Sequence, residues 1–350
     1  MKLLFFIFLL TLISLLGFLA WSSYPWSNQE RVMTPEILSF ETESIMDVEE
    51  SPSVIRLLSW NIGFLYGKGS EGPGYAFREK EFYLSRLEQL VTEIKNWNPD
   101  ILCLQEVDFD SYRSHGINQA RYLAQKAGYP YVAEAVSWES NYIPFPYLPV
   151  KNNFGRISSG GAVLSKYPLS NHQVTLLAKP AAQPWWYNLF YLHRYFQRVT
   201  VEIGTKKIRL LNLHLEAFDK VDREGQVKKL MALAASGGPD MLVGDFNMVP
   251  EIATKKRKFF NDDDYENDRS FSLLQKSSYL EVIPDAIYSK NEQAYFTFPA
   301  WAPDRRLDYI FYQQGLKLTK AEVLPSALSD HLPIWASFLI DTPKFNPYSQ

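Results

Sequence analysis

Apolar residues form short blocks along most of the chain, and polar residues follow many of these blocks. The blocks at 54–60, 101–104 and 241–243 consist mainly of aliphatic and aromatic residues, as is typical of buried strands. From Arg78 to Trp97, apolar residues recur every three to four positions, which predicts an amphipathic helix that Asn98 and Pro99 end. These patterns predict a layered sheet structure.

The same patterns predict further elements. Predicted strands are 54–61, 101–104, 130–136, 159–165, 198–203, 207–213, 241–243, 307–312 and 334–339; predicted helices are 78–97, 121–128 and 224–235. Strands 198–203 and 207–213 form a hairpin across Gly204 and Thr205. We expect Gly244 to turn the chain so that Asp245 and Asn247 project together at a strand's end.

The N-terminus has a different character from the rest of the chain. Residues 3–21 are almost uninterruptedly apolar after Lys2, close to the roughly 20 residues that cross a bilayer. We expect residues 1–21 to be an uncleaved membrane anchor with the bulk exported, although a cleaved signal that yields a secreted protein is the alternative. Residues 22–53 are expected as an acidic linker, 54–340 as one catalytic domain and 341–350 as a tail.

Composition narrows the class of protein. The chain has 350 residues, 46% of them hydrophobic, which suffices for one large domain, and we expect a monomer. Proteins that hold polyphosphate chains typically have an excess of basic residues, but the net charge of this chain is −3. This charge weakens a nuclease interpretation. Cys103 is the only cysteine, so no disulfide forms within the chain, and its apolar surroundings predict a buried thiol.

Polar residues with catalytic or ligating side chains stand at the ends of many apolar blocks. They are Asn61, Glu106, His214, Asp245, Asn247, Asp308, Asp330 and His331. Each alone has an ordinary explanation as a turn former, a cap or a hydrogen-bonded core histidine. Together they indicate one site at one edge of the sheet structure.

Six ordered motifs carry a family resemblance. They are Ser-Trp-Asn61, Leu-Gln-Glu106, Asn-Leu-His214-Leu, Gly-Asp245-Phe-Asn247, Arg-Leu-Asp308-Tyr-Ile and Ser-Asp330-His331-Leu-Pro. In these motifs the chain resembles the endonuclease/exonuclease/phosphatase superfamily, the DNase I-like metal-dependent phosphoesterases. The resemblance spans roughly residues 54–339. It implies an α/β fold, a four-layer α/β sandwich of two mixed β-sheets flanked by helices.

The resemblance also implies a metal site. Glu106 and Asn61 would hold a divalent cation that neutralises charge on the phosphoester and assists the leaving oxygen, and Asp330 would add to the metal shell. Oxygen ligands without a Cys/His cluster favour Mg²⁺ or Mn²⁺ over zinc.

The remaining motif residues would carry the chemistry. Asp245 and Asn247 would orient the attacking water. His331 would act as general base or as a hydrogen-bond donor to the transition state, with Asp308 holding its tautomer. His214 would protonate the leaving group or bind a phosphoryl oxygen.

The substrate is left open between a lipid and a nucleic acid. The aromatic insertion at 184–196 and a second aromatic stretch at 138–149 fit either a lipid interface or base stacking, and a core helix or lid is the structural alternative. With the anchor, they favour a membrane-associated lipid phosphodiesterase that resembles the sphingomyelinase branch. A surface or secreted nuclease is the alternative, supported by the basic block 255–258 within a region expected as a solvated loop. A catalytically inactive, anchored binding module is the third interpretation.

Overall fold

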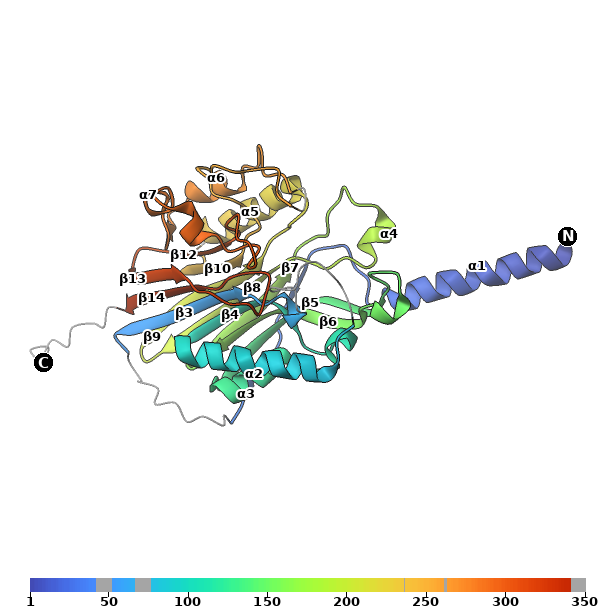
Figure 1. Ribbon diagram of the computed structural model, residues 1–350, viewed down its shortest axis with the longest axis horizontal. Coiled ribbons are helices and arrows are strands. Elements are labelled where there is room, and N and C mark those ends of the chain that lie inside the picture. Colours follow the sequence, from blue (N-terminus) through green and yellow to red (C-terminus); the bar gives the residue numbers. More distant parts are fainter. Residues whose placement is uncertain (42–51, 67–76, 236, 261–262, 341–350) are drawn as a thin grey trace, which may run out of the picture.

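Two seven-stranded sheets pack face to face in the computed structural model, which describes residues 1–41, 52–66, 77–235, 237–260 and 263–340 (Figure 1). The strands of the first sheet, in spatial order, are β1 (Arg31–Met33), β7 (Leu169–Leu176), β8 (Tyr195–Ile203), β9 (Lys206–His214), β10 (Met241–Asp245), β12 (Asp308–Tyr312) and β11 (Leu280–Glu281). Those of the second are β13 (Leu316–Val323), β14 (Ile334–Ile340), β3 (Val54–Asn61), β4 (Ile101–Asp108), β6 (Gly155–Ser165), β5 (Tyr131–Ile143) and β2 (Ile37–Ser39). Both sheets are mixed, because β9–β10 and β3–β4 are parallel pairs among antiparallel neighbours.

Helices form the two outer layers. The helices are α1 (Lys2–Ser22), α2 (Lys80–Trp97), α3 (Gln119–Ala127), α4 (Trp185–Asn188), α5 (Lys220–Ala235), α6 (Ser270–Gln275) and α7 (Asp285–Tyr288). The short 3₁₀ turns are η1 (Gly63–Leu65), η2 (Tyr112–Ser114), η3 (Val150–Asn152) and η4 (Glu292–Tyr295). Helices α2 and α3 lie below the sheets in Figure 1, while α5, α6 and α7 lie above them.

Three hydrophobic cores separate these layers. Side chains of α2 and α3, such as Leu90, pack with residues such as Leu104 on the outer face of the second sheet. Side chains of α5 and α6, such as Leu230, pack against the outer face of the first sheet. Between the sheets, Leu57 and Cys103 meet residues of β8, β9, β10 and β12. The predicted four-layer sandwich is confirmed, and Cys103 is a fully buried thiol in its central layer.

Most predicted elements are present, but several extend further than the sequence indicated. Strand β4 continues to Asp108, and β5 continues to Ile143. The predicted hairpin is confirmed, with Ile203 opposite Lys206. The region 255–269 was expected to be a solvated loop, but Phe259 and Tyr265 are buried there in a small apolar cluster.

The segment 22–53, expected as an acidic linker, contains two short strands in its described part. Strand β1 pairs antiparallel with β7, and β2 pairs antiparallel with β5, so this segment joins the outer edge of both sheets. Residues 42–51, which hold most of its acidic side chains, lie outside the described part of the chain. The glycines of the stretch 63–74 predict a flexible loop after β3, and Gly67, Gly69, Gly72 and Gly74 of that stretch also lie outside the described residues. The helix α1 is the one described helix long and apolar enough to cross a membrane.

Gly244 has a different function from the turn that was expected. It lies inside β10 at φ +142°, where an added Cβ would sit 2.0 Å from the carbonyl oxygen of Leu213 on β9. The turn itself comes later, at Asn247, whose φ is +50°. Glycine at 244 therefore permits the close contact between the two strands that end in His214 and Asp245.

Gly244→Ala is expected to lower the free energy of unfolding by about 3 kcal/mol or more, because it adds backbone strain to a clash with Leu213. Gly225→Ala is the matched control. Nothing lies within 4 Å of a Cβ at Gly225 in α5, so that change should leave stability equal or raise it by roughly 0.5–1 kcal/mol. Denaturant unfolding of both variants measures the difference, and equal stabilities would contradict the assigned strand contact.

Candidate active site

Three neighbouring strands of the first sheet end at the same level. In the β9–β10 pair His214 lies opposite Asp245, and in the β10–β12 pair Asp245 lies opposite Asp308. Strand β12 runs antiparallel to the other two, so its first residue reaches the edge at which β9 and β10 finish. The strand register thus brings an imidazole and two carboxylates together.

The second sheet supplies Asn61 and Glu106 at the facing edge. Asn61 is the last residue of β3 and is paired with Gln105 of β4. The β4–β6 register shifts between Leu104 and Val107, which marks a bulge, and Glu106 has a φ of +53° within it. Bulges redirect side chains, and this one turns the Glu106 carboxylate toward Asn61, whose Nδ2 donates to Glu106 Oε1 at 3.3 Å.

The loop before β14 is fixed to the end of β3. The Trp60 indole donates to the His331 carbonyl at 2.8 Å, and the Ser329 hydroxyl donates to the Asn61 carbonyl at 2.7 Å. The His331 amide in turn donates to the Ser329 hydroxyl. These bonds hold His331 and the neighbouring Asp330 over the same edge.

Asp245 lies at the centre of this group. Its Oδ2 accepts from Asn61 Nδ2 at 3.0 Å and lies 3.7 Å from His331 Nε2, while its Oδ1 accepts from the Asn247 amide at 2.9 Å. Burial raises the pKa of Asp245 to about 7; His331 and Asn61 lower it, and the nearby Asp308 adds to the rise. The positive charge around Asp245 is therefore too small to offset the cost of burying its ionised carboxylate.

His331 is paired with Asp308. Its Nδ1 donates to Asp308 Oδ2 at 2.8 Å, which leaves Nε2 facing the site. Burial lowers the pKa of His331, but Asp308, Asp245 and Asp330 outweigh burial and raise it to about 10. This balance favours the imidazolium form.

His214 has a different environment, because Arg194 Nη1 lies 2.6 Å from its Nε2. Burial, followed by the positive charges of Arg194 and His331, holds the pKa of His214 well below its usual value. A neutral imidazole that accepts from Arg194 explains both observations. The 3.4 Å approach of the same nitrogen to Asp245 is then a contact rather than an ion pair.

Arg194 was not predicted as a site residue. Its Nη2 reaches the Tyr191 hydroxyl at 3.3 Å and its Nε reaches Glu216 at 3.4 Å, so the guanidinium is fixed on three sides, with His214 on the third. The predicted hairpin could have indicated Arg194. If the pairing of β8 with β9 is continued from the turn to the far ends of both strands, Tyr195 lies opposite His214, and Arg194 immediately precedes Tyr195.

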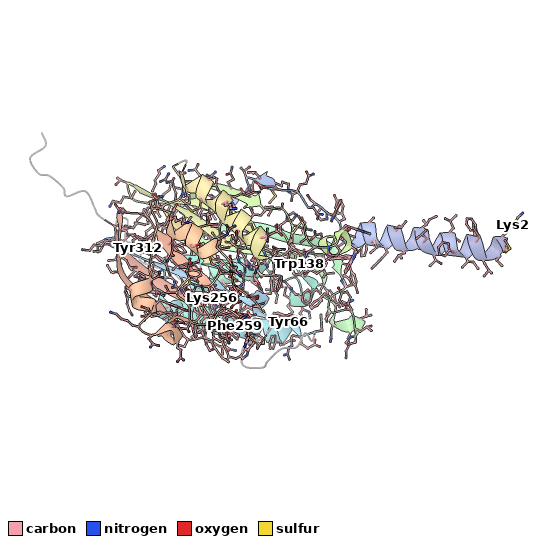
Figure 2. All side chains as sticks on the ribbon, turned by 90° about the horizontal axis from the view of Figure 1, so that it is seen from above. Lys2, Tyr66, Trp138, Lys256, Phe259 and Tyr312 are labelled. Carbon is pink, nitrogen blue, oxygen red and sulfur yellow. The ribbon has the colours of Figure 1, made fainter. Side chains whose placement is uncertain are left out.

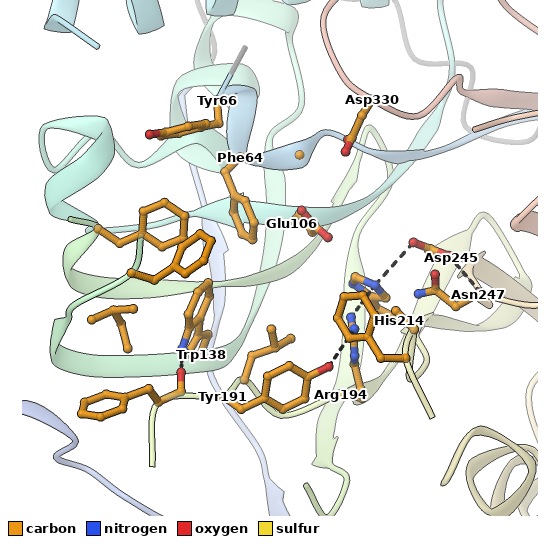
Figure 3. Close-up of a pocket in the computed structure, with 18 of the residues that line it drawn as sticks. Phe64, Tyr66, Glu106, Trp138, Tyr191, Arg194, His214, Asp245, Asn247 and Asp330 are labelled. Carbon is orange, nitrogen blue, oxygen red and sulfur yellow. Dashed lines mark hydrogen bonds and ion pairs between the residues drawn. The ribbon is translucent and has the colours of Figure 1, made fainter. Parts of the chain in front are cut away.

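One cavity of about 680 Å³ opens over these residues. Its polar end is lined by Glu106, Arg194, His214, Asp245, Asn247, Asp330 and His331. Its other side carries the aromatic wall, which consists of Phe64, Tyr66, Trp138, Phe145, Tyr147, Phe154, Trp186, Tyr187 and Phe190. Figure 3 shows Asp245 and His214 on the opposite side of the cavity from Tyr66 and Trp138, with Glu106 between them beside Phe64. Asn61 and Asp308 lie behind the polar end, bonded to residues that line it.

Comparison with known proteins identifies the group to which this arrangement belongs. The model of the endonuclease/exonuclease/phosphatase family matches residues 58–331, from β3 to His331. The chain belongs to the endonuclease/exonuclease/phosphatase family. Members of the family hydrolyse phosphoesters with the help of a divalent metal ion, so the protein is a phosphoester hydrolase.

Three similar proteins are distant from this chain in sequence. Nocturnin of Mus musculus is 24% identical over 336 residues, which cover 83% of this chain and 67% of Nocturnin. An endonuclease/exonuclease/phosphatase from Beutenbergia cavernae DSM 12333 matches with a TM-score of 0.62 and 20% identity, covering 83% of this chain and 72% of that one. The human Nocturnin catalytic domain with bound sulfate anion matches with a TM-score of 0.53 and 19% identity, covering 87% and 97%. These likenesses show a shared fold.

The residues at the polar end fit a divalent cation of the kind the family uses. Asp245, Asp308 and His331 each offer a ligand atom within 4.8 Å of the others. Asp308 Oδ1 is buried without a hydrogen-bond partner, and burial together with the charge of Asp330 raises the pKa of Glu106. A cation would relieve both, since it stabilises ionised carboxylates.

This compact group of Asp245, Asp308 and His331 differs from the metal ligands predicted from the sequence. Those were Glu106, Asn61 and Asp330. The Asp308–His331 hydrogen bond accounts for much of that compactness. Asn61 presents its nitrogen to the carboxylates, so its amide would have to turn to bind a metal through oxygen. The assignment of Glu106, Asn61 and Asp330 to the metal stays a prediction.

Proposed function

We propose that the protein is a membrane-anchored phosphodiesterase that uses Mg²⁺ or Mn²⁺ to hydrolyse a phospholipid such as sphingomyelin. The cavity that joins a charged end to a long aromatic wall is the observation that carries this proposal. A phospholipid also has a charged part and an apolar part, because its phosphodiester headgroup is attached to apolar chains. The wall offers apolar surface that a free polynucleotide would leave largely unused.

The metal would be held by Glu106, with Asn61 and Asp330 beside it, and would neutralise charge on the phosphoryl group. Asp245 and Asn247 orient the attacking water. The side-chain Nδ2 of Asn247 donates to the Leu215 carbonyl at 3.0 Å, which fixes this side chain at the cavity wall. Asp245 accepts the hydrogen bond that aligns the water.

His331 donates through Nε2 to the phosphoryl group, because Asp308 already occupies Nδ1. Of the two functions predicted for this residue, its raised pKa supports the donor over the general base. Arg194 donates to a phosphoryl oxygen, and the neutral ring of His214, which accepts from the guanidinium at Nε2, orients it. Tyr191 and Glu216 hold the guanidinium in place.

A nuclease is the second candidate, and the family description supports it. The basic block at 255–258 provides less support than its sequence suggested. Lys255 lies 3.0 Å from Asp304, and Arg257 lies 3.0 Å from Glu266, so acidic partners offset part of the block's charge. A polyphosphate chain would have to displace these partners.

The test compares initial rates of the full chain on sphingomyelin-containing vesicles and on plasmid DNA, each with Mg²⁺ and with EDTA. The proposal predicts phosphocholine release that requires Mg²⁺ and stops in EDTA, without DNA nicking. Asp245→Ala supplies the blank for contaminating enzymes. DNA nicking that disappears in this variant, with no lipid hydrolysis, would instead establish the nuclease.

A further inference from the structure

The helix α1 joins the catalytic domain without an intervening spacer. Ser22, its last residue, is fully buried, and Ser23 is 3% exposed. The Ser140 hydroxyl of β5 donates to the Ser22 carbonyl at 2.5 Å, and Asn141 Nδ2 donates to the Trp21 carbonyl at 2.9 Å. The last turn of α1 is therefore fixed to the end of β5.

The rest of α1 projects away from the domain (Figures 1 and 2). Its 21 residues correspond to about 31 Å of helix, which matches the ~30 Å hydrocarbon core of a bilayer. Lys2 is the one charged side chain in this helix, and the apolar side chains along it are exposed. With α1 in a bilayer and its last turn fixed to β5, the domain must lie directly at the membrane surface.

The cavity opens at this same end of the domain. Leu19 of α1 lines the cavity together with Phe145 and Trp186, so the helix forms part of its wall. The ring centroids of Phe18 and Tyr142 are 5.9 Å apart, which adds an aromatic contact between α1 and the end of β5. Figure 1 places α4 on the side from which α1 leaves, and α7 at the opposite end.

Large apolar side chains are exposed around this opening. The apolar rim consists of Trp21, Tyr147, Leu148, Val150, Trp185 and Trp186, with exposed fractions from 55% to 79%. Tyr147 and Trp186 belong both to the rim and to the cavity lining. Tryptophan and tyrosine favour the headgroup layer, since their rings are apolar and their tips are polar. The arrangement gives α1 an interfacial belt made of residues distant in sequence.

We infer that the apolar rim rests in the headgroup layer of the bilayer that holds α1, so that the cavity opens into that layer rather than into bulk water. The inference depends on the membrane anchoring in the proposed function, but not on which phosphoester is cleaved. The partner of the apolar rim is the surface of a phospholipid bilayer, because the rim continues the apolar surface of α1. Substrate would enter laterally between α1 and α4.

The test places fluorescent labels on the full chain in phosphatidylcholine nanodiscs. Cys103 is fully buried, so Leu148→Cys and Trp185→Cys each provide one reactive thiol on the rim, and neither residue lines the cavity. Ile287→Cys on α7, whose side chain is 44% exposed, is the matched control at the far end of the domain. Each variant carries a bimane label, and spin-labelled lipids serve as quenchers.

Bimane at positions 148 and 185 is expected to lose most of its emission to quenchers near the headgroups, while bimane at 287 keeps its emission. Equal quenching at all three positions would overturn the inference. Release of the labelled protein from the discs would also overturn it, by showing that α1 does not anchor the chain. Quenching at the rim in a protein that cleaves no lipid would retain the membrane surface and reject only the proposed substrate.

Discussion

His331→Ala is expected to lower kcat by at least ~10²-fold, the usual effect of losing one positioned proton donor or acceptor. His331 is held by Asp308 at Nδ1 and by the Trp60 indole at its carbonyl, and its Nε2 faces Asp245. Alanine removes the donor and leaves the phosphoryl group without this hydrogen bond as charge develops on it. The measurement is the initial rate at saturating substrate and Mg²⁺.

His172→Ala is the matched control for a lost buried histidine. His172 is also buried and hydrogen-bonded, with Nδ1 3.1 Å from the Pro35 carbonyl, but it lies outside the cavity. This control should keep its kcat even if its Tm falls. A near-normal rate for His331→Ala, or an equal loss in both variants, would reject the function assigned to His331.

Asp245→Asn is expected to cause the largest loss of activity, with kcat falling by about 10³-fold or more, because it removes the negative charge that orients the attacking water and faces His331 Nε2. The substitution keeps the shape of the side chain. Its hydrogen bond from the Asn247 amide can remain, so the loss reports charge rather than packing. Rates measured over a range of Mg²⁺ concentrations would separate weaker metal binding from slower chemistry.

The same variant should not lose stability. Burial raises the pKa of Asp245 from 3.8 to about 7, so the folded state binds this proton more tightly than the unfolded state does. The stabilising contribution of the neutral form is complete below pH 3.8 and is lost as the pH rises through 7. At pH 8 in EDTA, Asp245→Asn should therefore have a Tm equal to or above that of the parent protein.

Asp100→Asn is expected to have the opposite effects, a lower Tm with an unchanged kcat. Asp100 is buried far from the cavity, with Arg56 at 2.7 Å and Lys166 at 3.2 Å. Losing this carboxylate leaves the buried Lys166 and the partly exposed Arg56 without their partner, which should lower Tm while kcat is retained. Equal changes in Tm for both variants would reject the view that Asp245 is retained for function at a cost in stability.

The motif residues could be found in the sequence because they stand at the ends of apolar blocks, which are strong local signals for strands. The apolar block 54–60 ends in Asn61, as β3 does, and β9, β10 and β12 end or begin at the predicted polar residues. Glu106 also belongs to the site, although strand periodicity cannot predict the bulge that redirects it. Such a bulge depends on the pairing partner β6, which is distant in sequence.

Other features could not be read from local patterns. Strands β1 and β2 have three residues each, and only pairing with β7 and β5 makes them strands. Arg194 is a site residue because the hairpin continues past the predicted strand to Tyr195. The aromatic stretches at 138–149 and 184–196 gave no sign that they would form one wall of one cavity, since that requires the fold.

The position of β1 and β2 has a consequence for self-association. Each covers part of the outermost long strand of its sheet, and exposed strand edges are templates for pairing with other chains. A protein trimmed back to residue 54 would lose both covers and leave the backbone groups of Arg31's partner Leu176, and of Ile37's partner Ala133, open to another molecule. The segment between α1 and β3 thus protects both sheets from edge-to-edge aggregation, and a form that lacks α1 should begin before Arg31.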